Sequence, residues 1–103
     1  METYLKKKVE IIIEAPLMRR IIEHLEARQV SGYSVFPVLA GRGHEGSWRA
    51  DGLVGDTGRM VAVMCIVDAT ELDLLLEEIF PLVQQQIGIV TVSDVQVIRR
   101  DHF

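Results

Sequence analysis

The residues best suited to bind an anion lie in a glycine-rich stretch and near the end of the chain. Gly41-Arg42-Gly43 combines glycines, which let backbone N–H groups approach an oxyanion, with a planar guanidinium fork. Arg99 and Arg100 follow the last apolar segment. Each segment alone has an ordinary interpretation, a turn for the first and a solvated tail for the second. Two arginine-bearing segments flanking a sheet in an acidic chain together favour an anion site.

The stretch from Ala40 to Gly58 is too long for an ordinary hairpin connection, which takes about two to five residues. Its glycines make it flexible, and Trp48, Leu53 and Val54 are apolar side chains that could pack against another surface. We expect it to be mobile alone and ordered by a ligand or partner. Tryptophan is enriched at interaction hot spots, although Trp48 could equally pack on another copy of this chain.

The remaining chemistry-bearing residues give little support for an enzyme. His44 and His102 are too isolated to argue a metal site, and no Ser-His-Asp or Cys-His arrangement follows from the spacing. His24 is expected to be solvated on the polar side of a helix. Cys65, the only cysteine, lies in an apolar run and is predicted to be a buried core thiol, which fits a reducing cytoplasm.

The bulk properties indicate one ordinary globular domain. The chain has 103 residues, 49% of them hydrophobic and 25% charged, so we expect a single domain over residues 1–103. The net charge of −4 argues against general nucleic-acid binding. No apolar stretch reaches the roughly 18 residues of a membrane span, and the first residues lack the apolar core of a signal peptide. We therefore predict a cytoplasmic protein.

The first half of the chain predicts a strand, a helix and a second strand. Apolar residues alternate along residues 9–14, with the period of two that a strand requires. Helical spacing follows Pro16, which suits a first helical turn, and Ser31-Gly32 is expected to stop the helix. Tyr33 to Leu39 is rich in strand-forming residues, and Pro37 places this strand at an edge or a bulge.

The second half predicts a strand, a helix and a strand again. Met60 to Val67 is almost wholly apolar, as in a strand covered on both faces. Asp68 and Glu71 resemble a capping box before a helical pattern that Pro81 should kink or interrupt. The last strand is expected from Ile89 to Arg99.

This order, β-α-β-β-α-β, predicts an α+β, ferredoxin-like fold with a long connection between its second and third strands. Right-handed crossovers would put both helices on one face of a four-stranded antiparallel sheet, with the first and third strands in the centre. The other face still carries Val, Ile and Met, so self-association is the simplest way to cover it.

Short stretches in this order resemble the PII signalling superfamily. They are Lys8-Val9-Glu10-Ile11-Ile12, Gly32-Tyr33-Ser34-Val35 leading to Gly41-Arg42-Gly43, and Val92-Ser93-Asp94-Val95 with Arg99 and Arg100. The resemblance covers nearly the whole chain in element order. It implies a homotrimer with an adenine-nucleotide site in each cleft between neighbouring subunits, and it makes Arg42 to Gly58 the T-loop, which meets partner proteins.

The resemblance also assigns roles to particular residues. The residues of its nucleotide site are Ile12, Ser34, Gly41, Arg42, Gly43, Ile66, Arg99 and Arg100. The serine would touch the adenine and the isoleucines would wall it, while the glycines and arginines would lie along the phosphates. No cofactor or metal is required.

Two departures from the nitrogen-regulating members narrow the expectation. Residues 84–88 are shorter than their Gly-rich loop and lack its phosphate-binding lysine, which favours ADP or AMP over a triphosphate. The long loop contains no tyrosine, so uridylylation there is not expected. The chain is more similar to the PII-like group associated with inorganic-carbon uptake and carboxysomes. That group adds bicarbonate as a second ligand hypothesis, with Arg42, His44 and Arg49 as donors.

We thus expect a non-enzymatic signalling trimer in which adenine nucleotide changes the T-loop and so regulates a transporter or carbon-metabolism protein. Direct membrane insertion is not expected. An alternative is a small trimeric ferredoxin-like enzyme or metal-tolerance protein, which bound metal would favour. A purely structural oligomerisation module is a third reading, favoured if no adenine nucleotide shifts the melting temperature.

Overall fold

The computed structural model describes residues 1–43, 46–49 and 59–99. The main elements are β1 (Tyr4–Glu14), α1 (Met18–Ala27), β2 (Tyr33–Val38), β5 (Met60–Val67), α2 (Ala69–Gln84) and β6 (Gly88–Val97). A 3-10 turn, η1 (Ala15–Leu17), leads into α1, and a short hairpin of β3 (Ala40–Gly43) and β4 (Gly46–Arg49) follows β2.

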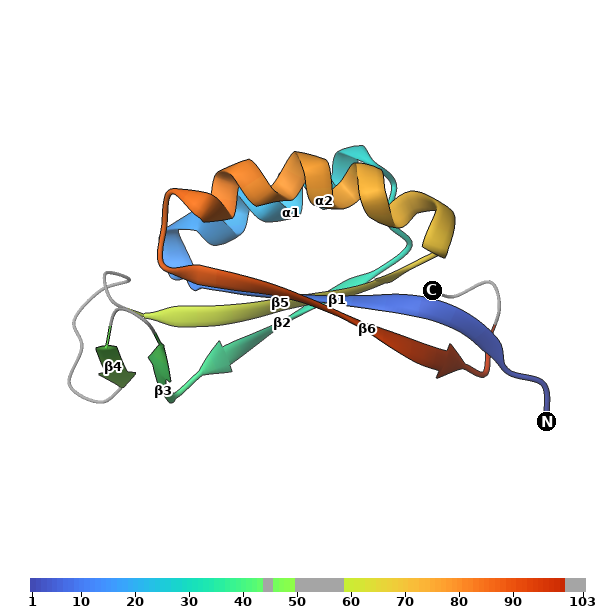
Figure 1. Ribbon diagram of the computed structural model, residues 1–103, viewed down its shortest axis with the longest axis horizontal. Helices are drawn as coiled ribbons and strands as arrows, with labels where there is room; N and C mark the ends of the chain where they lie inside the picture. Colours follow the sequence, from blue (N-terminus) through green and yellow to red (C-terminus); the bar gives the residue numbers. More distant parts are fainter. Residues whose placement is uncertain (44–45, 50–58, 100–103) are drawn as a thin grey trace.

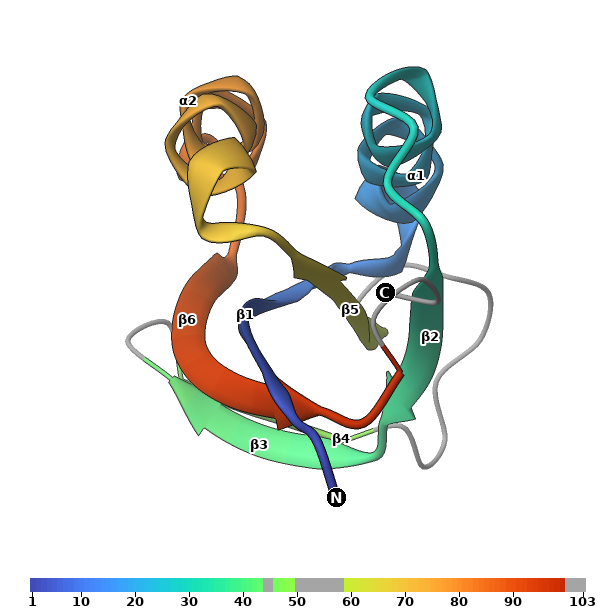
Figure 2. The same ribbon diagram turned by 90° about the vertical axis from the view of Figure 1, so that its right-hand side faces the viewer.

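The main sheet is antiparallel with the strand order β2-β5-β1-β6. Both helices lie over the same face of this sheet (Figures 1 and 2). The predicted ferredoxin-like fold is confirmed, with the first strand and the apolar Met60–Val67 strand at the centre. Pro37, which cannot donate to a ladder, lies on the edge strand β2, as expected.

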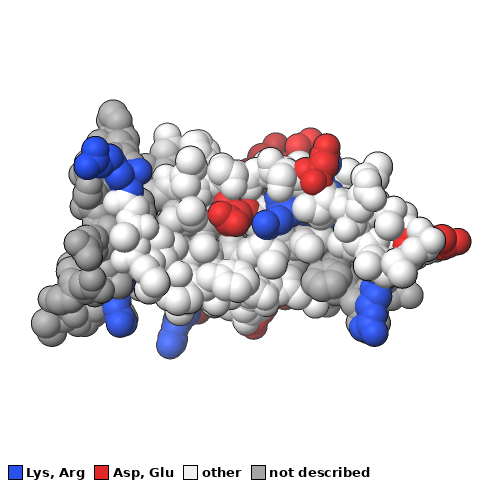
Figure 3. All heavy atoms as spheres, turned by 90° about the horizontal axis from the view of Figure 1, so that it is seen from below, with Lys and Arg blue, Asp and Glu red and all other residues white. Residues whose placement is uncertain are grey.

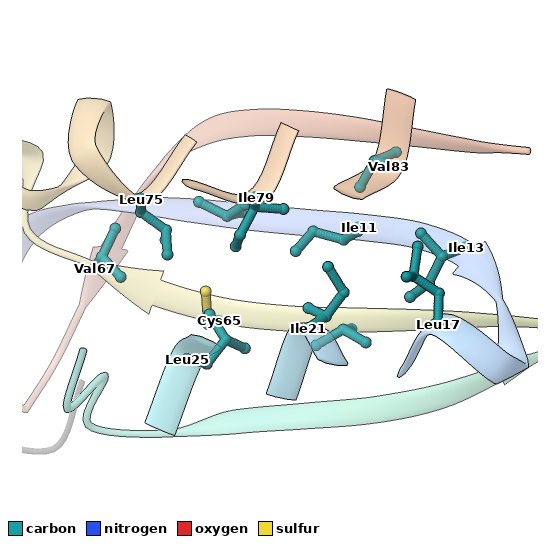
Figure 4. Packing of buried hydrophobic residues seen from close by; sticks show 12 residues of the cluster. Ile11, Ile13, Leu17, Ile21, Leu25, Cys65, Val67, Leu75, Ile79 and Val83 are labelled. Carbon is teal, nitrogen blue, oxygen red and sulfur yellow. The ribbon is translucent and has the colours of Figure 1, made fainter. Parts of the chain in front are cut away.

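The face of the sheet toward the helices, here called the covered face, builds the core. On β1 the alternating residues Val9, Ile11 and Ile13 are fully buried. Ile11 lies across from Val63 of β5, and the helices contribute buried apolar side chains from above (Figure 4). Those helix residues are Leu17, Ile21, Leu25, Leu75, Ile79 and Val83. Each large apolar side chain buried in this way contributes about 1.5 to 3 kcal/mol to folding.

The opposite face, here called the open face, is covered by neither α1 nor α2, the two α-helices of the described ranges (Figure 2). One row of residues crosses it from edge to edge, namely Phe36, Ala62, Ile12 and Ile89. Phe36 is 50% exposed and Ile89 is 55% exposed. Viewed from this side, the middle of the face is mostly uncharged (Figure 3). The chain described here therefore leaves apolar surface uncovered.

Three boundaries differ from the sequence-based expectation, one of them in β6, which runs from Gly88 to Val97 rather than from Ile89 to Arg99. β1 begins at Tyr4 rather than at Val9, because its first residues pair with the end of β6. α1 ends at Ala27, and Gln29 adopts the left-handed conformation with φ 59°. The Val30 N–H then reaches the Leu25 carbonyl at 3.1 Å. This is a helix-ending hydrogen bond, so Ser31-Gly32 does not stop the helix.

Two expectations for α2 hold only in part. The helix continues through Pro81 to Gln84, so the proline does not interrupt it. Asp68 is the N-cap by position, but its side chain makes no capping hydrogen bond. Its carboxylate contacts the Lys6 ammonium on β1 instead. No helix among the described residues is both long and apolar enough to cross a membrane.

Candidate functional site

The Gly41-Arg42-Gly43 segment forms strand β3 of a small hairpin. Arg42 lies across from Ser47, and Ala40 lies across from Arg49. Alternate residues of a strand share a face, so the backbone positions of Arg42 and Arg49 are diagonal neighbours on one face of this hairpin. Such backbone positions lie about 7 to 8 Å apart.

The predicted apolar walls and the serine occupy the open face of the main sheet. Ile12 lies across from Ala62, Ser34 across from Met64, and Ile66 across from Lys8. The β5 members of these pairs, Ala62, Met64 and Ile66, are alternate residues of one strand, so the three pairs lie on the same face of the sheet. The pair that contains Ser34 lies between the other two. The two isoleucines are therefore separated by four residues along the ladder, about 13 Å.

The two arginine segments lie at opposite ends of the sheet within one chain. Arg99 is two residues beyond Val97, which pairs with Tyr4 at the start of β1. The hairpin follows Val38, which pairs with Met60, and Met60 pairs with Glu14 at the end of β1. About ten residues of strand separate these ends, about 33 Å. Figure 1 shows the hairpin at one end of the sheet and the end of β6 at the other. A site that uses both segments needs two copies of the chain.

Several predicted residues lie outside the described part of the chain. They are His44, Leu53, Val54 and Arg100. For Trp48 only the backbone position can be given, which is directly across from Gly41 in the hairpin.

A glycine not anticipated from the sequence lies close to one wall of the site. A Cβ added to Gly88 would be 2.9 Å from the Ile12 carbonyl oxygen and 3.0 Å from a methyl carbon of Val83. Only glycine therefore fits where β6 begins, next to β1 and α2. The sequence shows only that a glycine precedes the predicted last strand. The close approach of Gly88 to the backbone of β1 can be recognised only when the pairing of β1 with β6 is known.

A polar cluster joins the two helices and corrects the expectation that His24 is simply solvated. His24 Nδ1 lies 2.5 Å from one carboxylate oxygen of Glu78, and Arg28 Nη1 donates to the other at 2.9 Å. Hydrogen bonding from His24, with a further contribution from Arg28, lowers the pKa of the Glu78 carboxyl. The cluster ties α1 to α2 and is far from the hairpin in sequence.

Two other titratable residues have structural surroundings. Cys65 is 1% exposed, and burial raises its thiol pKa to about 11. The thiol is therefore neutral at pH 7, which confirms the prediction of a core cysteine. Tyr33 donates a 2.9 Å hydrogen bond to Glu26, and this bond raises the pKa of Tyr33. It ties the start of β2, beside Ser34, to α1. Within the described ranges, no three His, Cys, Asp or Glu side chains gather as metal ligands.

Comparison with known proteins gives consistent results for structure and family. CPII from Thiomonas intermedia K12, a PII-like protein bound to ADP, AMP and bicarbonate, is similar with a TM-score of 0.87 and 28% identity, over 95% of this chain and 92% of that one. The same protein bound to ADP and bicarbonate gives a TM-score of 0.82 and 30% identity, over 95% of this chain and 93% of that one.

A protein of Thermus thermophilus described as a PII-like signalling protein gives a TM-score of 0.78 and 25% identity, over 96% of this chain and 95% of that one. A search of curated proteins found no match to the sequence. The family model described as nitrogen regulatory protein P-II matches residues 6–102. The chain therefore belongs to the nitrogen regulatory protein P-II family.

Proposed function

We propose that this protein is a non-enzymatic signalling subunit that binds ADP or AMP in clefts between the copies of a homotrimer. Proteins of its family are generally non-enzymatic regulators. The observation that carries the proposal is the placement of the two arginine segments at opposite ends of one sheet. In our proposal neither end binds the phosphates alone, and the hairpin of one copy and the β6 end of its neighbour bind them together.

The sheet edges support a closed ring of copies. β2 and β6 are the two edge strands, and a groove of about 770 Å³ lies between α2 and β6. Its apolar lining includes Leu76, Phe80, Pro81, Ile89, Val90 and Val92. The opposite edge presents Phe36 of β2, which is 50% exposed. Two different complementary edges make a head-to-tail contact, which closes into a ring when the rotation allows it.

The charge distribution favours a short phosphate chain and a second small anion. In our proposal Arg42 and its flanking glycines bind the phosphates from one copy, and Arg99 and Arg100 bind them from the next. The segment before β6, residues 84–88, contains no lysine, which favours ADP or AMP over a triphosphate. We assign bicarbonate to the hairpin, where the Arg42 and Arg49 positions are diagonal neighbours and His44 follows. The similar protein CPII from Thiomonas intermedia was solved bound to ADP and bicarbonate, which supports the choice of these two ligands.

We propose that the T-loop is the part of the protein that responds to the bound nucleotide. Nucleotide would shift the T-loop, residues 42–58, toward the conformation to which it binds more tightly. The size of this shift is set by the difference in nucleotide-binding free energy between the two loop conformations. Trp48, Leu53 and Val54 would then be presented to a cytoplasmic partner, a transporter or another protein of inorganic-carbon metabolism. In this proposal the whole of residues 1–103 acts as one domain.

The proposal is tested by calorimetry with AMP, ADP, ATP, cyclic AMP and bicarbonate on the wild type and on Arg42→Ala. We expect ADP or AMP to bind most tightly, with one site per subunit in a trimer identified by light scattering. We expect Arg42→Ala to weaken ADP binding about tenfold or more, the loss of one charge-assisted hydrogen bond of about 1.5 to 3 kcal/mol, without lowering the melting temperature. Unchanged ADP affinity in Arg42→Ala, or binding to a monomer, would contradict the composite site.

A further inference from the structure

Two arginines at the start of α1 have no role in the proposed nucleotide site and no partner in the described part of the chain. Arg19 and Arg20 are both exposed. The acids nearest in sequence are Glu14 and Glu23, and neither forms an ion pair or hydrogen bond with these arginines. By contrast, Arg28 near the end of the same helix contacts two carboxylates. The unpaired guanidiniums are therefore available to a ligand.

Their position is electrostatically unfavourable for the helix. The first turn of α1 contains no acidic residue, and positive charge near a helix N-terminus opposes the helix dipole. A pair of arginines that destabilises its own helix and pairs with no described neighbour is better explained by an external contact than by folding.

The same end of the molecule adds a third arginine and an exposed apolar side chain. The Arg59 carbonyl accepts a 2.9 Å hydrogen bond from the Ala15 N–H, which joins the start of β5 to the turn before α1. Val38 pairs with Met60 at the end of the β2–β5 ladder, and Leu39 and Arg59 are the next residues of the two segments. Leu39 is 70% exposed. Figure 3 shows basic side chains at this end, where the hairpin also lies.

We propose that Arg19, Arg20, Arg59 and Leu39 form a docking surface for an acidic segment of a protein partner that also carries apolar side chains. The net charge of −4 repels extended polyanions such as nucleic acid and anionic membranes at long range, whereas a short acidic segment meets only the local field. The exposed leucine at the same end of the molecule fits a protein surface better than a phosphate backbone. This surface shares no residue with the proposed nucleotide site.

The test uses the full chain and a fluorescein-labelled peptide of about 12 residues made of Glu, Asp and Leu, with a Gln, Asn and Leu peptide of the same pattern for comparison. Binding is followed by anisotropy at low and high salt, about 50 and 300 mM NaCl, which bracket the range where screening becomes strong. We expect only the acidic peptide to bind, and salt to weaken it. We expect R19Q/R20Q to weaken its affinity about tenfold or more. The control K7Q/K8Q removes the same net charge from the other end of β1 and should change affinity less than about twofold.

Two further measurements keep the outcome clear. The melting temperature of R19Q/R20Q should not fall, because the change removes unfavourable charge from the helix start, and its ADP affinity should equal that of the wild type. Equal loss in both double variants would overturn the surface in favour of a net-charge effect. Stronger binding to vesicles containing phosphatidylserine, or to a short duplex DNA, than to the peptide would overturn the partner class.

Discussion

The two faces of the main sheet are built from the same strands but differ strongly in how far their side chains are buried. On β1, Val9, Ile11 and Ile13 are completely buried beneath the helices, while Glu10 and Ile12 between them are only half-buried. Strand geometry sends alternate side chains to opposite faces, so a single segment supplies both surfaces. The covered face completes its packing within one chain, and the open face does not. Stability should therefore depend on the first face, and assembly with ligand binding on the second.

The largest expected difference comes from truncating neighbouring isoleucines of β1. Ile11→Ala removes a fully buried side chain and should lower the free energy of unfolding by about 2 to 5 kcal/mol. Ile12→Ala lies on the open face and should cost less than about 1.5 kcal/mol in a monomer, but it should weaken self-association and ADP binding. Urea titration and light scattering measure the two effects. Equal destabilisation of the monomer by both variants would abolish the distinction between the faces.

A second variant tests the close packing at the start of β6. Gly88→Ala places a Cβ against the Ile12 carbonyl oxygen and the Val83 side chain, so backbone must move. We expect a loss of about 1 to 3 kcal/mol, as for other overpacked sites. Gly32→Ala is the matched control, because a Cβ there would meet nothing within 4 Å. A tolerated Gly88→Ala would mean that β6 can shift at little cost.

A third variant tests the polar cluster that ties the two helices together. Glu78→Gln should lower the free energy of unfolding by about 1 kcal/mol at pH 7, since the cluster is partly exposed. The folded state lowers the pKa of Glu78, so its stabilisation is present above the carboxyl's ordinary range and is lost as the pH falls through the folded pKa. Wild type and variant should thus converge in strongly acidic buffer. A difference that persists there would point to packing rather than charge.

The smallest effect should come from the end of α1. Gln29→Gly relieves a left-handed conformation that glycine adopts freely and should stabilise the protein by about 0.5 kcal/mol. Neither face of the sheet changes, so self-association and ADP binding should stay the same. Denaturant midpoints measured alongside light scattering would reveal any departure.

The sequence by itself determined the order and type of the main elements. Period-two alternation in residues 9–14 and the apolar run of 60–67 are local patterns, and they were sufficient for the ferredoxin-like arrangement and for the edge position of Pro37's strand. The apolar run also predicted correctly that Cys65 is buried. These inferences succeeded because side-chain periodicity follows directly from strand and helix geometry.

Only the tertiary structure decided which distant residues meet. It paired His24 with Glu78 across two helices, directed the Asp68 side chain to Lys6 instead of its own helix, and separated Arg42 from Arg99 by the length of a strand. No local pattern contains this information, because contacts between elements depend on strand register and on how the helices cross the sheet. The covered face could be predicted from the sequence because its residues pack within the chain. Which residues could share the proposed nucleotide site depends instead on the placement of Arg42 and Arg99 near opposite ends of β1.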